Sequence, residues 1–308
     1  MSEGHARGPA PTLRVQTVLF HNARDDVVRF TSSVVAACEH ALDGGAVCAT
    51  ELAIGDSSEH PLSDRAEDFL PDGPHPFSSV DYLHFGENLG SAGGHNRLFQ
   101  ESRADIVLVM NPDTYASPRL VTELVRGLAD SSVGVVEARQ LPLEHPKAHD
   151  PVTGDTSWAS GSCVLVRAEV VAATNGFDTE LFFLHGDDVD FSWRARLAGW
   201  RVVHRPSARV FHDKRLDDNG GLRPSERELE FSARAHVLLP WRYSRRDLAL
   251  ARLAALESSP ERYQRRIAAE LRAKIDAGDM PEPIDPDHRV AQFVGDEYAT
   301  HRFSYSDP

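Results

Sequence analysis

Short apolar runs alternate with segments of helical spacing along roughly the first 130 residues of the chain. Runs of this length predict buried strands, and apolar positions three or four residues apart predict helices. The predicted strands are residues 15–20, 50–54, 80–85 and 105–110. The predicted helices are residues 27–42, a segment from 97 onward and residues 117–128. Strands that alternate with helices indicate an α/β fold with a doubly wound, mostly parallel sheet.

Polar residues follow each of the four predicted strands. They are Asn22, Asp56, Asn88 and Asp113. Sheets of this kind bind their ligands at the carboxyl ends of their strands, where such residues meet. The sequence therefore predicts a polar ligand site at this edge of the sheet.

The pattern changes after residue 133. A strand at 133–138, a polar loop at 141–156 and an apolar segment at 160–167 follow, and from about residue 222 the chain is charged with helical spacing. Three parts are predicted. They are a disordered lead-in over residues 1–12, an α/β domain over 13–215 and a helical C-terminal extension over 216–308. The extension is too apolar for a detached tail, so it is expected to shape the site, form an oligomer interface or cover the core.

Composition excludes several classes of partner. The formal net charge of −14 argues against nucleic acid and against non-specific binding to an anionic membrane, but it permits a small anionic ligand held through a metal ion. Three widely spaced cysteines, Cys38, Cys48 and Cys163, indicate a reduced, cytoplasmic location. No apolar run approaches the length of a membrane span, and residues 1–11 lack the apolar core of a signal peptide.

An acidic cluster follows the apolar run that ends at Leu184. Gly186 is followed by Asp187 and Asp188, and Asp190 comes two residues later at the start of a helical pattern. One aspartate caps a helix, but three repel one another unless a cation, a ligand proton or a basic partner lies among them. The cluster favours an acidic catalytic corner. The alternative is an ordinary cap on a solvated helix end.

Asn111-Pro112-Asp113 directly follows the fourth strand. Its proline fixes the local backbone, and its carboxylate suits a divalent cation that bridges a diphosphate, although all three residue types also form plain turns. His212 ends a later apolar segment and could return to the same metal, or it is an ordinary surface histidine. His185 and His204 are interpreted as structural.

A glycine-rich stretch covers residues 88–96. It lacks the lysine of a phosphate-binding GxxxxGK[ST] loop and does not follow the first strand. Its small residues permit close approach of the backbone to a ligand, or a tight turn.

In their order and spacing these segments resemble the inverting glycosyltransferases of family 2, in the rhamnosyltransferase-like branch, over about residues 15–214. The matching positions are His21-Asn22 after the first strand, Asp56 after the second, Asn88, Gly90, Gly93, Gly94 and Asn96 in the glycine-rich stretch, Asn111-Pro112-Asp113, Ala159-Ser160-Gly161-Ser162, Gly186 to Asp190, Arg194, Gly199, Trp200 and His212. Asp187 departs from the family pattern, which usually has glutamate there.

The resemblance implies a GT-A fold and a set of roles. The donor, a UDP- or dTDP-linked sugar, would be bound by His21, Asn22, Asp56, Asn88, Gly90, Gly94, Asn96, Asn111 and Asp113. Mg²⁺ or Mn²⁺ would be held by Asp113, with His212 as second ligand, and Ser160, Gly161 and Asp187 would line the acceptor side. Asp188 would be the general base. Asp187 would orient the acceptor or tune the proton affinity of Asp188, and Asp190 would brace the helix.

The implied activity is transfer of a hexose, with inversion, to a sugar, lipid-linked or natural-product acceptor. A lipid-linked acceptor would place the protein at a membrane surface. Whether the protein forms a homo-oligomer is left open by the sequence. Two alternatives remain at this point. One is a non-catalytic nucleotide-sugar-binding or regulatory protein on the same fold, and the other is a sugar-phosphate nucleotidyltransferase.

Overall fold

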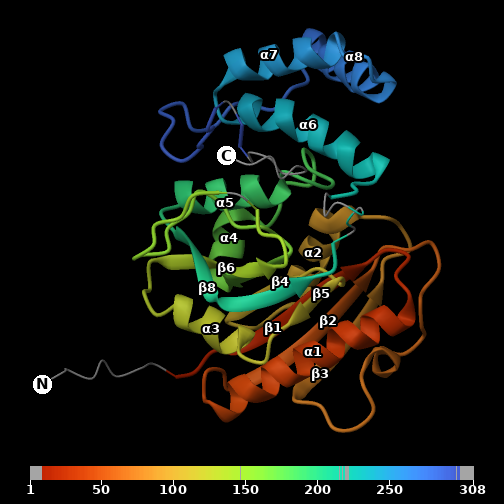
Figure 1. Cartoon of the computed structure of the whole chain (residues 1–308), viewed down its shortest axis with the longest axis vertical. Coiled ribbons are helices and arrows are strands. Elements are labelled where there is room, and N and C mark those ends of the chain that lie inside the picture. The colour runs from red at the N-terminus through yellow and green to blue at the C-terminus, as the bar shows by residue number, and fades with distance from the viewer. Residues whose placement is uncertain are drawn as a thin grey trace, which may run out of the picture.

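The computed structural model describes residues 9–145, 147–214, 216, 218, 222–295 and 297–298. These residues form one eight-stranded sheet with helices on both faces and a further helical layer at one end (Figure 1). Most of the predicted lead-in, residues 1–8, and the last ten residues of the predicted extension lie outside the described part. The first strand begins at Thr12.

The first half of the sheet is parallel. β1 (Thr12–Leu19), β2 (Ala49–Asp56), β3 (Phe77–His84) and β4 (Ile106–Met110) lie in the order β3-β2-β1-β4. All five residues of β4 are buried, because helices cover both faces of this central strand. The four predicted strands and the doubly wound α/β class are confirmed.

The second half of the sheet is mixed. It contains β5 (Thr114–Ala116), β6 (Val133–Leu141), β7 (Cys163–Arg167) and β8 (Arg201–His212). β7 is antiparallel to both β4 and β6, β8 is parallel to β6, and the short β5 is antiparallel to β8. β5 has only three residues, which is too short for periodicity to reveal it.

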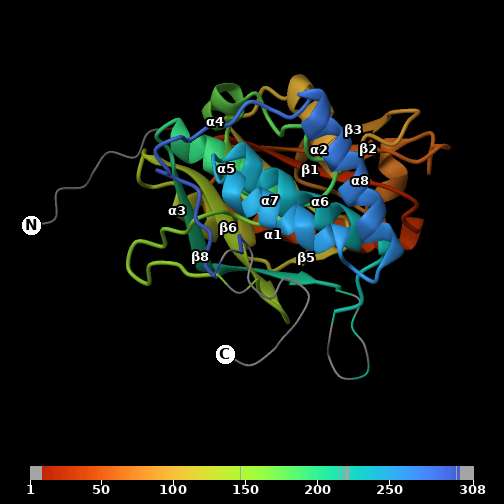
Figure 2. The same cartoon turned by 90° about the horizontal axis from the view of Figure 1, so that it is seen from above.

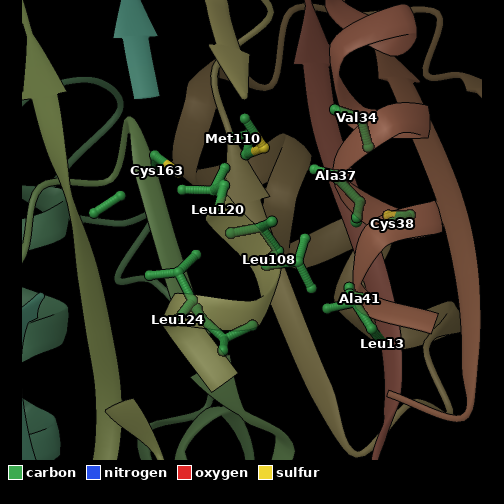
Figure 3. Close-up of a cluster of buried hydrophobic side chains, with 14 of the residues drawn as sticks. Leu13, Val34, Ala37, Cys38, Ala41, Leu108, Met110, Leu120, Leu124 and Cys163 are labelled. Atoms are coloured by element: carbon green, nitrogen blue, oxygen red, sulfur yellow. The ribbon is translucent and has the colours of Figure 1, made fainter. Parts of the chain in front are cut away.

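Two apolar clusters on opposite faces of the sheet hold the helices. On one face α1 (Arg24–Asp43) and α3 (Leu120–Gly127) pack on alternate residues of β1 and β4, such as Leu13 and Leu108 (Figure 3). On the other face α2 (Gly90–Glu101), α4 (Ala168–Thr174) and α5 (Asp187–Leu197) pack on the intervening residues, such as Val109. A short 3₁₀ helix, η1 (Ala66–Phe69), lies in the long loop after β2.

The C-terminal helices form a layer over α5. They are α6 (Glu226–Arg242), α7 (Arg246–Glu257) and α8 (Arg262–Ala277), and two perpendicular views place them together (Figures 1 and 2). Ser225 and Glu228 form a reciprocal capping box at the start of α6. Within the described residues, no helix combines the length and the apolar character that crossing a membrane requires.

One apolar cluster joins this layer to α5. Trp158, Val189 and Trp193 pack in it together with residues of all three C-terminal helices, such as Leu239 and Leu271. Val189 and Trp193 lie on α5, the helix that begins with the acidic cluster. The C-terminal helices therefore cover buried residues of that helix.

Removal of residues 215–308 should abolish folding of the remainder. Full burial of a large apolar side chain is worth about 1.5–3 kcal/mol, and the truncation uncovers Trp158, Val189 and Trp193 at once. The combined loss from these three side chains is comparable with a total stability of about 5–15 kcal/mol. We expect fragment 1–214 to aggregate or to lack cooperative unfolding in circular dichroism. A soluble, fully active monomer from this fragment would contradict the packing described.

Candidate active site

The acidic cluster lies in a buried corner at the start of α5. Gly186 precedes the helix at φ 81°, an angle that glycine adopts readily, and a Cβ there would lie 2.9 Å from the Cβ of Ala235 on α6. Asp187 and Asp188 are 8% and 7% exposed, and Asp190 is fully buried. A solvated helix end, the alternative interpretation, would leave these side chains in water.

Asp190 braces α5 from within. Its Oδ2 accepts a hydrogen bond of 2.7 Å from Nε of Arg194, and its Oδ1 accepts one of 3.0 Å from the hydroxyl of Tyr243 at the end of α6. Burial raises the pKa of Asp190, and the Arg194 guanidinium opposes that rise. Arg194 also donates to the carbonyl oxygens of Thr174 and Gly176. These contacts support the bracing role expected for Asp190.

Asp188 is held against the 159–162 segment (Ala159 to Ser162). Its Oδ2 accepts a hydrogen bond of 3.1 Å from the backbone N–H of Gly161, and its Oδ1 accepts one of 2.9 Å from the N–H of Val189. One turn later, the hydroxyl of Ser192 donates to the carbonyl of Asp188 and accepts from the N–H of Ala159. Gly161, one of the expected acceptor-side residues, is thus in direct contact with the expected general base.

The same segment reaches the Asn111-Pro112-Asp113 turn at its other end. The backbone N–H of Asn111 donates to the carbonyl of Ser162 over 3.0 Å. The carbonyl of Asn111 in turn accepts from the hydroxyl of Thr114 over 2.7 Å, which closes the turn into β5. Four residues therefore connect the acidic corner with the turn that carries Asp113.

The two expected metal ligands face each other across the β5–β8 pair. Thr114 pairs with His212, and this register brings Oδ1 of Asp113 to 3.4 Å from Nε2 of His212. Gln140 on β6 lies behind the imidazole, with its Oε1 2.8 Å from Nδ1 of His212. A proton on Nδ1 then leaves the lone pair of Nε2 on the side of Asp113.

These residues fit a divalent ion held in part by its ligand. Carboxylate and imidazole are suitable donors for Mn²⁺, and Mg²⁺ or Mn²⁺ beside a diphosphate takes few protein ligands. The Asp113 side chain is about half exposed, at 49%, so an ion there is open to phosphate oxygens. Among the residues that the structure describes, no three His, Cys, Asp or Glu side chains come close enough together to hold a metal ion alone.

The Asp56 carboxylate accepts hydrogen bonds from the loop that follows β2. Asp56 is fully buried, and its carboxylate accepts from the N–H groups of Ser58 and Leu62 and from the hydroxyl of Tyr82, at 2.9, 3.0 and 2.5 Å. Burial raises the pKa of Asp56, but these hydrogen bonds outweigh it and hold the pKa below its ordinary value. Contact with a nucleotide base remains a prediction.

Asp56→Asn should therefore destabilise the protein in a pH-dependent way. A carboxyl group whose pKa falls on folding contributes stability above its unfolded pKa, about 3.9, and loses it as the pH falls through the folded value. We expect the free energy of unfolding to fall by about 1–3 kcal/mol at pH 7 and the deficit to shrink below about pH 4. Denaturant titrations at pH 7 and below about pH 4 measure these free energies of unfolding for the variant and the wild type. Exposed Asp64→Asn in the same loop is the control, and a deficit that does not change with pH would contradict the account.

His21 and Asn22 form the turn after β1. His21 adopts φ 56°, its N–H donates to the hydroxyl of Ser58 over 3.0 Å, and its ring lies 3.1 Å from the Glu59 carboxylate. The Asn22 side chain accepts from the N–H of Phe20 over 2.9 Å. The polar ends of β1 and β2 thus meet, as the pattern of the strands predicts.

At several positions of the glycine-rich stretch, hydrogen bonds or close packing within the protein account for the residue type. Asn88 accepts from the N–H of Gly90 over 3.0 Å, and Gly90 adopts φ 67° where a Cβ would lie 2.5 Å from the Phe183 carbonyl. A Cβ on Gly94 would lie 2.7 Å from Val18. The amide of Asn96 both donates to and accepts from the backbone of Phe177 over 2.8 Å. Asn96 therefore joins α2 to the chain before the acidic corner, and a donor contact from it stays a prediction.

Two residues at the site have no counterpart in the sequence interpretation. Glu137 and Gln140 on β6 are buried and contact Ser160 and His212 respectively. Glu137 interrupts the apolar run 133–138, and a charged residue in a buried strand is a signal that could have identified it. For His204, the contact with Glu137 supports the structural interpretation.

Residues 20–149 match the model of the family described as Glycosyl transferase family 2. This match covers somewhat less than half of the chain. It is similar to N-acetylglucosaminyl-diphospho-decaprenol L-rhamnosyltransferase of Mycobacterium tuberculosis, with 35% identity over 111 residues that cover 35% of this chain and 36% of that protein. It is also similar to the pre-mycofactocin glycosyltransferase of the same organism, with 25% identity over 183 residues that cover 53% of this chain and 37% of that protein. The chain thus spans only about a third of the curated relatives it matches.

Similarity in three dimensions extends over most of the chain. The crystal structure of GalNAc-T7 with UDP, GalNAc and Mn²⁺ superposes on 89% of this chain and 60% of its own, with a TM-score of 0.56 and 12% sequence identity. At that identity the similarity concerns the fold, and the GT-A fold expected from the resemblance is confirmed.

Proposed function

We propose that this protein is a family 2 glycosyltransferase that transfers a sugar from a UDP- or dTDP-linked donor to an acceptor hydroxyl, with inversion and with a divalent metal ion. One observation carries the proposal. The 159–162 segment contacts Asp188 through the N–H of Gly161 and the Asn111-Pro112-Asp113 turn through the carbonyl of Ser162. A carboxylate suited to accept a proton and a carboxylate suited to hold a metal ion are thereby fixed relative to each other.

The residues have separate roles in the proposed reaction. Asp188 takes the proton from the acceptor hydroxyl while that oxygen attacks the anomeric carbon, and Asp187, beside it, orients the acceptor. Gly161 and Val189 hold the Asp188 carboxylate in place through their N–H groups. A single displacement of this kind inverts the anomeric configuration.

Asp113 and His212 would hold Mg²⁺ or Mn²⁺. Such an ion, once bound there, would offset the negative charge of the diphosphate leaving group. The 3.4 Å separation of the two side chains and the contact of Gln140 with His212 support this assignment. The Mn²⁺ in the GalNAc-T7 crystal structure supports metal use on this fold.

We further propose that residues 13–215 form the catalytic domain and residues 216–308 an extension that covers α5, and that the protein acts in the cytoplasm. The acceptor is a sugar, lipid-linked or natural-product hydroxyl. A lipid-linked acceptor is the first to test, because the Mycobacterium tuberculosis relative is named for a diphospho-decaprenol substrate.

The test is a donor panel. The protein is incubated with UDP- and dTDP-linked sugars, a rhamnosyl donor first, and with lipid-linked and free sugar acceptors in Mn²⁺, Mg²⁺ or EDTA. Released nucleoside diphosphate and the anomeric configuration of the product are measured. We expect metal-dependent release and an inverted product. Donor binding without transfer would instead favour a non-catalytic nucleotide-sugar-binding protein, and a retained configuration would contradict the single displacement.

A further inference from the structure

Glu137 is a charged residue inside an apolar strand. It lies on β6 with no exposed surface, between Val136 and Ala138, which are also fully buried. Its Oε1 accepts hydrogen bonds from Nζ of Lys147 over 2.6 Å and from the N–H of Ser160 over 2.7 Å. Its Oε2 lies 3.0 Å from Nδ1 of His204.

The 159–162 segment is fixed from two sides by its backbone. The N–H groups of Ala159 and Gly161 point to α5, where they meet Ser192 and Asp188. The N–H of Ser160, between them, points the opposite way, to Glu137 on the sheet. The segment is therefore held between the acidic corner and β6, and Glu137 is its partner on the sheet side.

We propose that Glu137 is a positioning residue for the transfer reaction. By accepting the Ser160 N–H it fixes the 159–162 segment, and through that segment it sets where Asp188 lies relative to the turn that carries Asp113. This inference rests on the proposed function of Asp188 and Asp113. Glu137 itself touches neither donor nor acceptor in this account.

The ionic partners of Glu137 explain how a carboxylate persists at this depth. Burial raises the pKa of Glu137, but Lys147 and His204 outweigh burial and keep it below its ordinary value. Nζ of Lys147 also lies 4.0 Å from the ring centroid of Trp158, next to the segment. A buried ion pair is weak evidence for stability, since apolar replacements are often tolerated as well. The more specific consequence of this carboxylate is the position of the Ser160 N–H, which donates a hydrogen bond to it. An apolar residue cannot accept that hydrogen bond.

Three variants separate positioning from folding. Glu137→Met together with Lys147→Met removes the acceptor and its buried counter-charge at once, so no unpaired ammonium is left. Glu137→Gln keeps an acceptor oxygen of the same reach. Glu123→Met is the matched control, because Glu123 is a buried carboxylate paired with Arg119, Arg126 and Arg205 on the α3 side of the sheet.

We expect the double variant to lose roughly tenfold to a hundredfold in kcat, since a displacement of about 1 Å in a catalytic group has this scale of effect. Its KM for the donor should stay within about threefold, because the donor contacts are intact. Glu137→Gln should restore most of the kcat, and Glu123→Met should leave kcat unchanged at temperatures where it is folded. A folded double variant with wild-type kcat would overturn the inference, as would an equal loss in the Glu123 control.

A crystal structure of the double variant decides the same point without turnover. Displacement of Ser160 with loss of the contact between Gly161 and Asp188 supports the positioning role, and an unmoved segment overturns it. Wild-type protein that transfers no sugar in the donor panel would count against the proposed function, whereas the crystal structure tests the positioning of Asp188 alone.

Discussion

Asp188→Asn is expected to lower the turnover number by about two to four orders of magnitude, the usual scale for loss of a general base. The amide has the shape of the carboxylate and keeps one oxygen for the N–H of Gly161 or Val189, which Asp188 now binds through its two oxygens. It cannot accept a proton from the acceptor hydroxyl. Donor binding, measured by calorimetry with the nucleotide sugar, should survive while transfer falls.

Asp187→Asn is the matched comparison for this experiment. Asp187 lies next in sequence and is buried to nearly the same extent as Asp188, at 8% against 7% exposure. If Asp187 orients the acceptor, its variant should raise the KM for the acceptor more than it lowers kcat. Near wild-type transfer by Asp188→Asn together with a dead Asp187→Asn would assign the base to position 187.

Asp113→Ala is expected to abolish metal-dependent binding of the nucleoside diphosphate. The chain carries a net charge of −14, so a diphosphate needs a cation to offset repulsion, and Asp113 is the exposed carboxylate beside His212. Loss of several kcal/mol of charge stabilisation corresponds to a weakening of about 100-fold or more. Titration calorimetry with UDP and dTDP, with and without Mn²⁺, measures the effect.

A distant carboxylate controls for the change in net charge. Asp276 is exposed near the end of α8, and Asp276→Ala removes one negative charge as Asp113→Ala does. It should leave the titration heats unchanged. Wild-type heats for Asp113→Ala in Mn²⁺ would place the metal elsewhere, and equal losses in both variants would point to a general electrostatic effect.

The sequence by itself determined the α/β class, and it predicted the edge of the sheet where the candidate site lies. The apolar run at 105–110 is almost continuous because β4 is covered on both faces, and that pattern is local. The turn at Gly186 and the acidic start of α5 were likewise readable, because a helix start needs particular residues within a few positions. These features depend on neighbours along the chain.

Only the tertiary structure decided which of these groups meet. The three-residue β5 pairs with β8 and thereby brings Asp113 to His212, 99 positions later in the numbering of the chain. The contacts of Ser160 with Glu137 and of Gly161 with Asp188 join residues that are 23 and 27 positions apart. A periodic pattern reports which face a residue occupies, but a hydrogen bond depends on strand register and on the path of loops. Register and loop path follow from the packing of the whole sheet, so a pattern read along the chain does not contain them.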